Sequence, residues 1–385
     1  MADSEALGIK SLETVVFYVN DLHRSHRFYT EFFDFEWSGE SSHGLEESSG
    51  QRTRVYRAGN IRMTITQPLS SGSQSGRYLR RHPDGITSLV FEVDDVAKTY
   101  SVLGARGATI VDDVSWTEDS SGGRYGFFEI ATPFGESTFR FVERHDFDGA
   151  RPGIQHFDSP RGGTNSLGFN DFDHVTSNFL TLKPMVLWCE QVLGLEKYWG
   201  IKFHTDDLAP DNDHGSGLRS MVLWDPHSGV KFANNEPMKP HFESSQIYTF
   251  VVDNQGAGIQ HVALTAGDIM STVRGLNARN VKFMRTPRTY YDALPERLNT
   301  SGIIAIDEDI ETLAELGILI DGKEEGKYLL QIFLKEAAGL YEDQSAGPFF
   351  FEIIQRKGDM GFGGGNFRAL FESIEREQKE LGPAS

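Results

Sequence analysis

The sequence has a single cysteine, a shortage of basic residues and no long apolar run. Among its 385 residues, Cys189 stands alone, which excludes an intrachain disulfide and fits a reducing compartment. No run of about 18 apolar residues, the length of a membrane-spanning helix, occurs. Residues 1–5 lack the basic and apolar segments of a secretory signal. We therefore expect a cytoplasmic protein with no membrane partner.

Acidic residues outnumber basic ones by 56 to 37, which gives a formal net charge of −19. No Lys/Arg block offsets this charge, so nucleic acids and anionic membrane surfaces are excluded as partners and a small molecule is favoured. The composition is globular, with 38% hydrophobic residues and 28 Phe. The length predicts more than one domain.

One pattern occurs four times along the chain: an alternating strand, an Asp or Asn near its end, an amphipathic helix, and further strands. The first strands are expected at residues 12–21, 86–95, 172–175 and 259–264. The helices are expected at 23–33, 96–103, 183–193 and 269–276, and the closing strands at 61–65, 138–142, 230–233 and 349–354. This pattern predicts an α+β fold built from repeated βαβββ-like modules.

The modules fall into two pairs, because residues 146–170 are rich in Gly, Pro, Ser and Asp and show no periodicity. We expect an N-terminal domain at 10–150, a linker at 151–169 and a C-terminal domain at 170–385.

Comparison of the four modules isolates one set of metal-ligating side chains. The equivalent positions are Thr14, Ser88, His174 and His261 in the first strands, and Thr64, Arg140, Ala233 and Glu352 in the last. Only the second pair offers ligands, and two His with one carboxylate form the facial triad of non-haem Fe(II) oxygenases. Glu352 lies in an apolar strand, where a carboxylate needs a cation. Arg140 cannot bind a metal, so we expect a metal-free N-terminal pair with a structural or interface role.

Several stretches resemble the 4-hydroxyphenylpyruvate dioxygenase family, which includes hydroxymandelate synthase and belongs to the vicinal-oxygen-chelate group. Residues 172–175 read FDHV, 258–264 read GIQHVAL, 351–356 read FEIIQR, and 361–367 read GFGGGNF. The resemblance runs from about 11 to 378 and is stronger in the second half. It implies two domains of paired modules, a C-terminal open barrel around the metal, and a lid helix at 366–380.

The resemblance also implies the chemistry. Fe(II) bound by His174, His261 and Glu352 would support the oxidative decarboxylation and ring hydroxylation of 4-hydroxyphenylpyruvate by O2, giving homogentisate and CO2 in tyrosine catabolism. The partners would be an aromatic 2-oxo acid and O2, in a homo-oligomer, either dimer or tetramer. The implied substrate-binding residues are Ser220, Asn235, Gln246, Gln260, Gln331, Phe333, Phe350, Phe362, Asn366 and Phe367.

Two departures from the family pattern keep alternatives open. Ala233 stands where the dioxygenase commonly has Pro, and Asn234 where it has an aliphatic residue. Ala233 leans towards a hydroxymandelate synthase acting at the benzylic carbon of the same substrate, whereas Asn235 and Phe350 lean towards the dioxygenase. A metal-free binding protein and an extradiol ring-cleaving dioxygenase are the alternatives from other classes.

Overall fold

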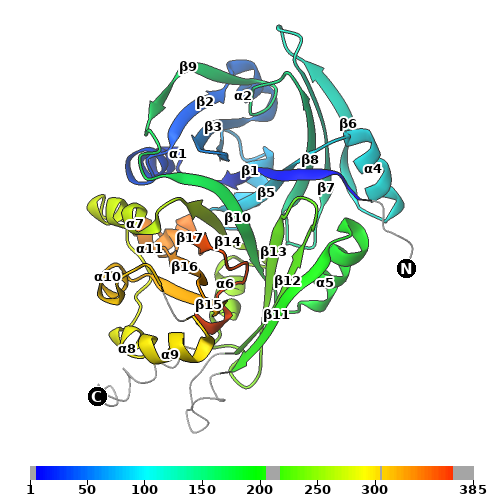
Figure 1. Cartoon of the computed structure of the whole chain (residues 1–385). Coiled ribbons are helices and arrows are strands. Elements are labelled where there is room, and N and C mark those ends of the chain that lie inside the picture. Colours follow the sequence, from blue (N-terminus) through cyan, green and yellow to red (C-terminus); the bar gives the residue numbers. More distant parts are fainter. Residues whose placement is uncertain (1–5, 205–216, 304–305, 367–385) are drawn as a thin grey trace.

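The computed structural model describes residues 6–204, 217–303 and 306–366 (Figure 1). Within these ranges, seventeen strands join into one hydrogen-bonded sheet. Figure 1 shows the N-terminal half, coloured blue to cyan, beside a C-terminal half coloured green to red. None of the described helices is both long and apolar enough to cross a membrane.

The elements follow the four expected modules. The first comprises β1 (Ile9–Tyr18), α1 (Leu22–Arg27), the π-helical turn η1 (Phe28–Phe32), β2 (Glu36–Ser41), α2 (His43–Ser49), β3 (Gln51–Ala58), β4 (Ile61–Pro68) and α3 (Gln74–Leu79). The second comprises β5 (Gly85–Val93), α4 (Val96–Ala105), β6 (Ile110–Glu118), β7 (Arg124–Ala131) and β8 (Thr138–His145). Strand β9 (Ile154–Gly162) connects the halves.

The third module comprises β10 (Phe169–Asn178), α5 (Lys183–Trp188), η2 (Cys189–Leu193), β11 (Glu196–His204), β12 (Gly217–Trp224), β13 (Lys231–Pro237) and α6 (Gln246–Asp253). The fourth comprises β14 (Gly258–Ala266), α7 (Ile269–Ala278), α8 (Arg288–Asp292), α9 (Leu294–Ser301), α10 (Ile310–Leu316), β15 (Leu319–Glu324), β16 (Lys327–Phe333), α11 (Ala337–Tyr341), η4 (Gln344–Ala346) and β17 (Phe350–Lys357).

The same strand register recurs in all four modules. In each, the first strand pairs in parallel with the last strand of its own module and antiparallel with the first strand of the partner module. The facing residues of the parallel pairs are Val16 and Thr64, Val90 and Arg140, Thr176 and Ala233, and Ala263 and Glu352. Each first-strand residue lies two positions after Thr14, Ser88, His174 or His261. The equivalence drawn from the sequence repeat is therefore confirmed.

The acidic residue after the first strand begins the helix in three of the modules. Asp21 accepts hydrogen bonds from the backbone N–H groups of His23 and Arg24, and Asp95 does so from Lys98. Asp268 plays the same part before α7. A side-chain oxygen at this position satisfies backbone donors that the first turn leaves unpaired, so the recurring Asp is a helix N-cap.

Phenylalanine rings join the two halves in one continuous core. Phe33, which follows η1, packs against Phe351 of β17 and Phe169 of β10, with ring centroids 5.0 and 5.5 Å away. Phe17 of β1 lies 5.3 Å from Phe349. These rings are at most 5% exposed. The two halves therefore cover each other through these buried rings.

The segment that connects the two halves, predicted as a linker, contains a strand. Residues 151–169 were expected to lack regular structure, yet they contain β9, which pairs antiparallel with β2. Most β9 side chains are exposed because, among the residues that the structure describes, the strand pairs only with β2. An exposed edge strand shows no hydrophobic alternation, which explains the missing pattern. The division into two domains stays a prediction.

The shared core makes a stability prediction. Replacing Phe33→Ala removes a fully buried ring from the contact between the halves and should lower the free energy of unfolding by about 3 to 5 kcal/mol. Equilibrium urea unfolding followed by circular dichroism measures this loss. The control is Leu69→Ala, at a side chain that is 48% exposed, where a change within about 0.5 kcal/mol is expected. Equal effects of the two substitutions would contradict a shared core.

Candidate metal centre

Three neighbouring strands bring the candidate ligands together. His174 lies on β10, His261 on β14 and Glu352 on β17, and β14 pairs with both other strands. Alternation along each strand turns these side chains to the interior of the C-terminal half. Their ligand atoms all lie within 4.8 Å of one another. The Glu352 carboxylate is 3.3 Å from His174 Nε2 and 3.4 Å from His261 Nε2.

The triad is buried, and its charges stabilise one another. His174, His261 and Glu352 are 5%, 7% and 3% exposed. Burial alone would raise the pKa of Glu352, but the two imidazoles outweigh it and hold that pKa at about 2. Burial lowers the pKa of His174, but Glu352 and Asp173 raise it to about 9. Burial also lowers the pKa of His261. Glu352 is thus an anion at neutral pH, ready to bind a cation.

Asp173 orients the first imidazole. It accepts a hydrogen bond of 2.8 Å from His174 Nδ1, which leaves Nε2 facing Glu352. Asp173 is held in turn by Arg356 through bonds of 2.6 and 2.7 Å, and Arg356 also donates to the backbone oxygen of Gly361 at 2.7 Å. Although burial raises the pKa of Asp173, Arg356 and His174 hold it well below its usual range. A carboxylate behind a histidine ligand sets its tautomer and raises its basicity.

Asp173 lies in the FDHV motif, but the motif alone predicts no role for it. Successive strand residues normally point to opposite faces, so Asp173 was not expected beside His174. The register of β10 against β14 is irregular between Phe172 and His174. This bulge brings the two side chains together.

Three of the predicted aromatic residues surround the imidazoles. Phe350 stacks on His261 with ring centroids 4.6 Å apart, and Phe333 meets the same ring edge-on at 6.1 Å. Phe362 meets His174 at 4.9 Å. The structure therefore brings Phe333, Phe350 and Phe362 to the triad, and their contact with a substrate stays a prediction.

Four of the predicted polar residues form two groups. Gln331, 4% exposed, accepts from Asn366 Nδ2 at 3.4 Å, and Asn366 Oδ1 accepts from the Tyr290 hydroxyl at 2.6 Å. Ser220 faces Asn235 across β12 and β13, and Asn235 Nδ2 donates to Asn178 Oδ1 at 3.1 Å.

Gln260 and Asn178 lie on the same strands as the two histidine ligands. Gln260 Oε1 lies 3.2 Å from His261 Nδ1, so it supports the second imidazole. Asn178 was not among the predicted site residues. It lies four residues after His174 on the same strand, so the alternation rule places both on one face.

Gly363, in the segment after β17, packs closely against Gln331. Its φ is +63°, and an added Cβ would lie 2.0 Å from Gln331 Oε1. Only glycine fits both the conformation and the contact.

Two predicted residues do not join these groups. Gln246 begins α6 with an exposed side chain, and among the described residues it has no hydrogen bond to the triad or to the other candidates. Phe367, with nearly all of the expected lid helix at 366–380, lies outside the described residues. Asn366 is the last residue described and is buried at 2% exposure.

The donor set fits a metal ion. Two imidazole nitrogens and one carboxylate oxygen approach from three adjacent strands, which leaves the opposite side of a bound ion to other ligands. The N-terminal half has Thr14, Ser88 and Arg140 at the equivalent positions, and the only cluster of potential metal ligands among the described residues is the triad.

Comparisons with known proteins agree with this geometry. Residues 11–137 match the model of the Glyoxalase/Bleomycin resistance protein/Dioxygenase superfamily. The chain is 36% identical over 385 residues to a 4-hydroxyphenylpyruvate dioxygenase of Dictyostelium discoideum, covering 97% of this chain and 100% of that relative. It is 37% identical over 322 residues to the enzyme of that name from Caenorhabditis elegans, covering 82% and 78% of the two chains.

A solved structure resembles the whole molecule. A variant of 4-hydroxymandelate synthase from Streptomyces coelicolor superimposes with a TM-score of 0.77 at 26% identity, covering 96% of this chain and 99% of that one. The fold is therefore the expected one of paired modules. Relatives above 30% identity extend over nearly the entire chain, and the chain belongs to the 4-hydroxyphenylpyruvate dioxygenase family.

Proposed function

We propose that this chain is an Fe(II)-dependent dioxygenase that converts 4-hydroxyphenylpyruvate and O2 to homogentisate and CO2. The observation that carries the proposal is the buried triad of His174, His261 and Glu352, walled by phenylalanines, in a chain of this family. Bound Fe(II) would supply sites for the 2-oxo acid and for O2, and the redox chemistry that joins them.

The chain's own residues hold and shield the reactants. Phe350 stacks on the His261 ring, and Phe362 meets the His174 ring in an edge-to-face arrangement. Phe333 adds a third ring, and together they offer edge and face contacts to an aromatic substrate while keeping water from the centre. Asn178 Nδ2 is buried without a partner among the described residues, so a substrate oxygen can accept its hydrogen bond.

A second candidate, hydroxymandelate synthase, rests on Ala233. This residue packs with Val222 and Phe362 on the interior wall, so its departure from the family pattern alters the surface that faces the substrate. Asn234 is turned to the opposite face, where its amide donates to the backbone oxygen of Phe232 at 3.1 Å. Asn235 remains paired with Asn178 on the interior side, which favours the dioxygenase. The cytoplasmic location, the oligomer and the pathway stay predictions.

The product distinguishes the two candidates. The protein would be reconstituted anaerobically with Fe(II) and 4-hydroxyphenylpyruvate and then exposed to O2, with products identified by mass and retention time. Homogentisate is expected. Hydroxymandelate would transfer the assignment to the synthase, and the absence of both products would reject the proposed substrate.

Removing the carboxylate charge tests the metal site. Glu352→Gln should weaken Fe(II) binding by at least about 100-fold, because a neutral amide is a poor ligand and no longer offsets the buried cation. Anaerobic competition with a chromogenic chelator measures the affinity. The matched control is Glu336→Gln, an exposed glutamate of the same module, which should bind Fe(II) like the parent. Unchanged affinity in Glu352→Gln would remove Glu352 from the ligand set.

The positioning role of Asp173 has its own test. Asp173→Asn should lower Fe(II) affinity about 10- to 100-fold by weakening the support of His174. Asp171→Asn, at an exposed residue two positions earlier on β10, is the control and should not change affinity. Melting temperatures of both variants exclude a folding defect. If Asp173→Asn binds Fe(II) as tightly as Asp171→Asn does, Asp173 does not position the ligand.

A further inference from the structure

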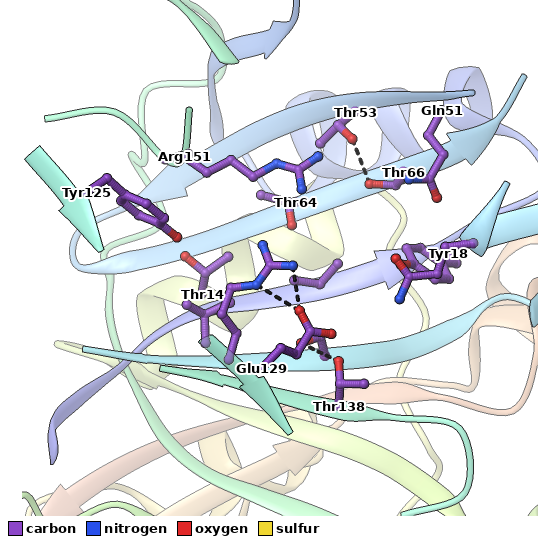
Figure 2. Close-up of a pocket in the computed structure, with 16 residues that line it drawn as sticks. Thr14, Tyr18, Gln51, Thr53, Thr64, Thr66, Tyr125, Glu129, Thr138 and Arg151 are labelled. Atoms are coloured by element: carbon purple, nitrogen blue, oxygen red, sulfur yellow. Dashed lines mark hydrogen bonds and ion pairs between the residues drawn. The ribbon is translucent and has the colours of Figure 1, made fainter. Parts of the chain in front are cut away.

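The N-terminal half encloses its own polar cavity, of about 50 Å³ (Figure 2). Thr14, Ser88 and Arg140 line it, and these are the residues that correspond in the repeat to His174, His261 and Glu352. The cavity therefore occupies the place in this half that the metal centre occupies in the other. Its chemistry is different because its walls carry guanidinium and hydroxyl groups.

The charges around this cavity do not balance. Arg140 donates to Glu129 Oε2 from Nη2 at 2.6 Å and from Nε at 3.0 Å, so these two residues neutralise each other. Arg151 also lines the cavity, and its guanidinium group has no hydrogen bond or ion pair among the described residues. Figure 2 shows its side chain extending over Thr64, across the cavity from Glu129. One positive charge of the cavity thus lacks a counterion.

Hydroxyl groups beside Arg151 are also unused. Among the described residues, neither the Thr64 hydroxyl nor the Tyr125 hydroxyl has a hydrogen bond, although these side chains are only 7% and 2% exposed. Both line the same cavity. A hydroxyl can donate to an anion at little cost, whereas a buried polar group without a partner is unfavourable.

We propose that this cavity binds a small planar oxyanion of one negative charge, with Arg151 as its main contact and Thr64 and Tyr125 as further donors. A guanidinium presents parallel N–H groups that match two oxygens of a carboxylate or of bicarbonate. At about 10 to 15 Å³ for each water, the volume suits roughly three to five non-hydrogen atoms. Acetate and bicarbonate have this size, and an aromatic 2-oxo acid is too large.

The electrostatic surroundings of Arg151 support an anion there. Burial lowers the pKa of Arg151, and the positive charge of Arg140 lowers it further. A bound anion would relieve both effects. The Arg140 side chain keeps 20% of its surface accessible to water, so part of it borders the space that the anion would fill.

The test measures anion binding directly. The melting temperature of the full chain would be recorded with increasing sodium acetate, and separately sodium bicarbonate in sealed samples, with sodium chloride keeping the ionic strength constant. A saturable rise is expected with at least one of the two oxyanions, because a ligand that binds only the folded state stabilises it. Line broadening of the ¹³C-labelled anion gives an independent affinity. The anion that binds more tightly identifies the ligand.

Two substitutions should act in opposite directions. Arg151→Gln leaves the cavity neutral and should weaken anion binding by at least about tenfold. Glu129→Gln removes the one negative charge and should strengthen it. If Arg151→Gln does not fold, Thr64→Val, which deletes one donor hydroxyl, should weaken binding several-fold. Arg81→Gln, an arginine whose side chain is 64% exposed, is the matched control and should bind like the parent.

Three results would overturn the proposal. They are no response to either oxyanion beyond that to chloride, an equal response in Arg151→Gln and Arg81→Gln, or weaker binding in Glu129→Gln. These measurements need neither iron nor the aromatic substrate, so their outcome is independent of the proposed dioxygenase activity.

Discussion

The parallel pairing of the first and last strand of each module is the constraint on which the rest of the structure depends. Its register is identical in all four modules, so the candidate ligand position of the first strand always lies two residues before the residue that faces the candidate position of the last strand. In the C-terminal half those positions carry His174, His261 and Glu352, and a shift of one residue would turn any of them to the opposite face. The scaffold therefore determines where chemistry can occur, and the residue type at each position determines which chemistry it is.

The two interiors solve the problem of buried charge in different ways. Around Glu352, two imidazoles contact the carboxylate, while Asp173 and Arg356 neutralise each other and leave the negative charge of Glu352 for a cation. In the N-terminal half, Glu129 balances only one of two guanidinium groups. Since an isolated buried charge is costly, each arrangement indicates the sign of what it accepts: a cation in one interior and an anion in the other.

The sequence predicted the modules, their arrangement in pairs and the three residues of the triad. It could do so because strand alternation, Asp helix caps and internal repetition can be recognised in the sequence itself. It did not predict β9, whose exposed edge leaves no hydrophobic pattern. The role of Asp173 depends on a bulge, which no local sequence signal announced. The substrate-binding role of Gln246 was predicted from the resemblance alone. Its exposure at the start of α6 depends on tertiary packing, which a single sequence does not reveal. Asn178 could have been found by extending the alternation from His174.

Adjacent residues of β17 perform unlike tasks. Phe351 points into the aromatic core shared with Phe33, while Glu352 points to the metal centre. β17 thus connects the core between the halves directly to the metal centre, because Phe351 and Glu352 are adjacent residues of the strand. Without the N-terminal half, the aromatic side chains around Phe351 would be exposed to solvent as an apolar patch. The N-terminal half in this way covers the aromatic face of the half that carries the candidate metal ligands.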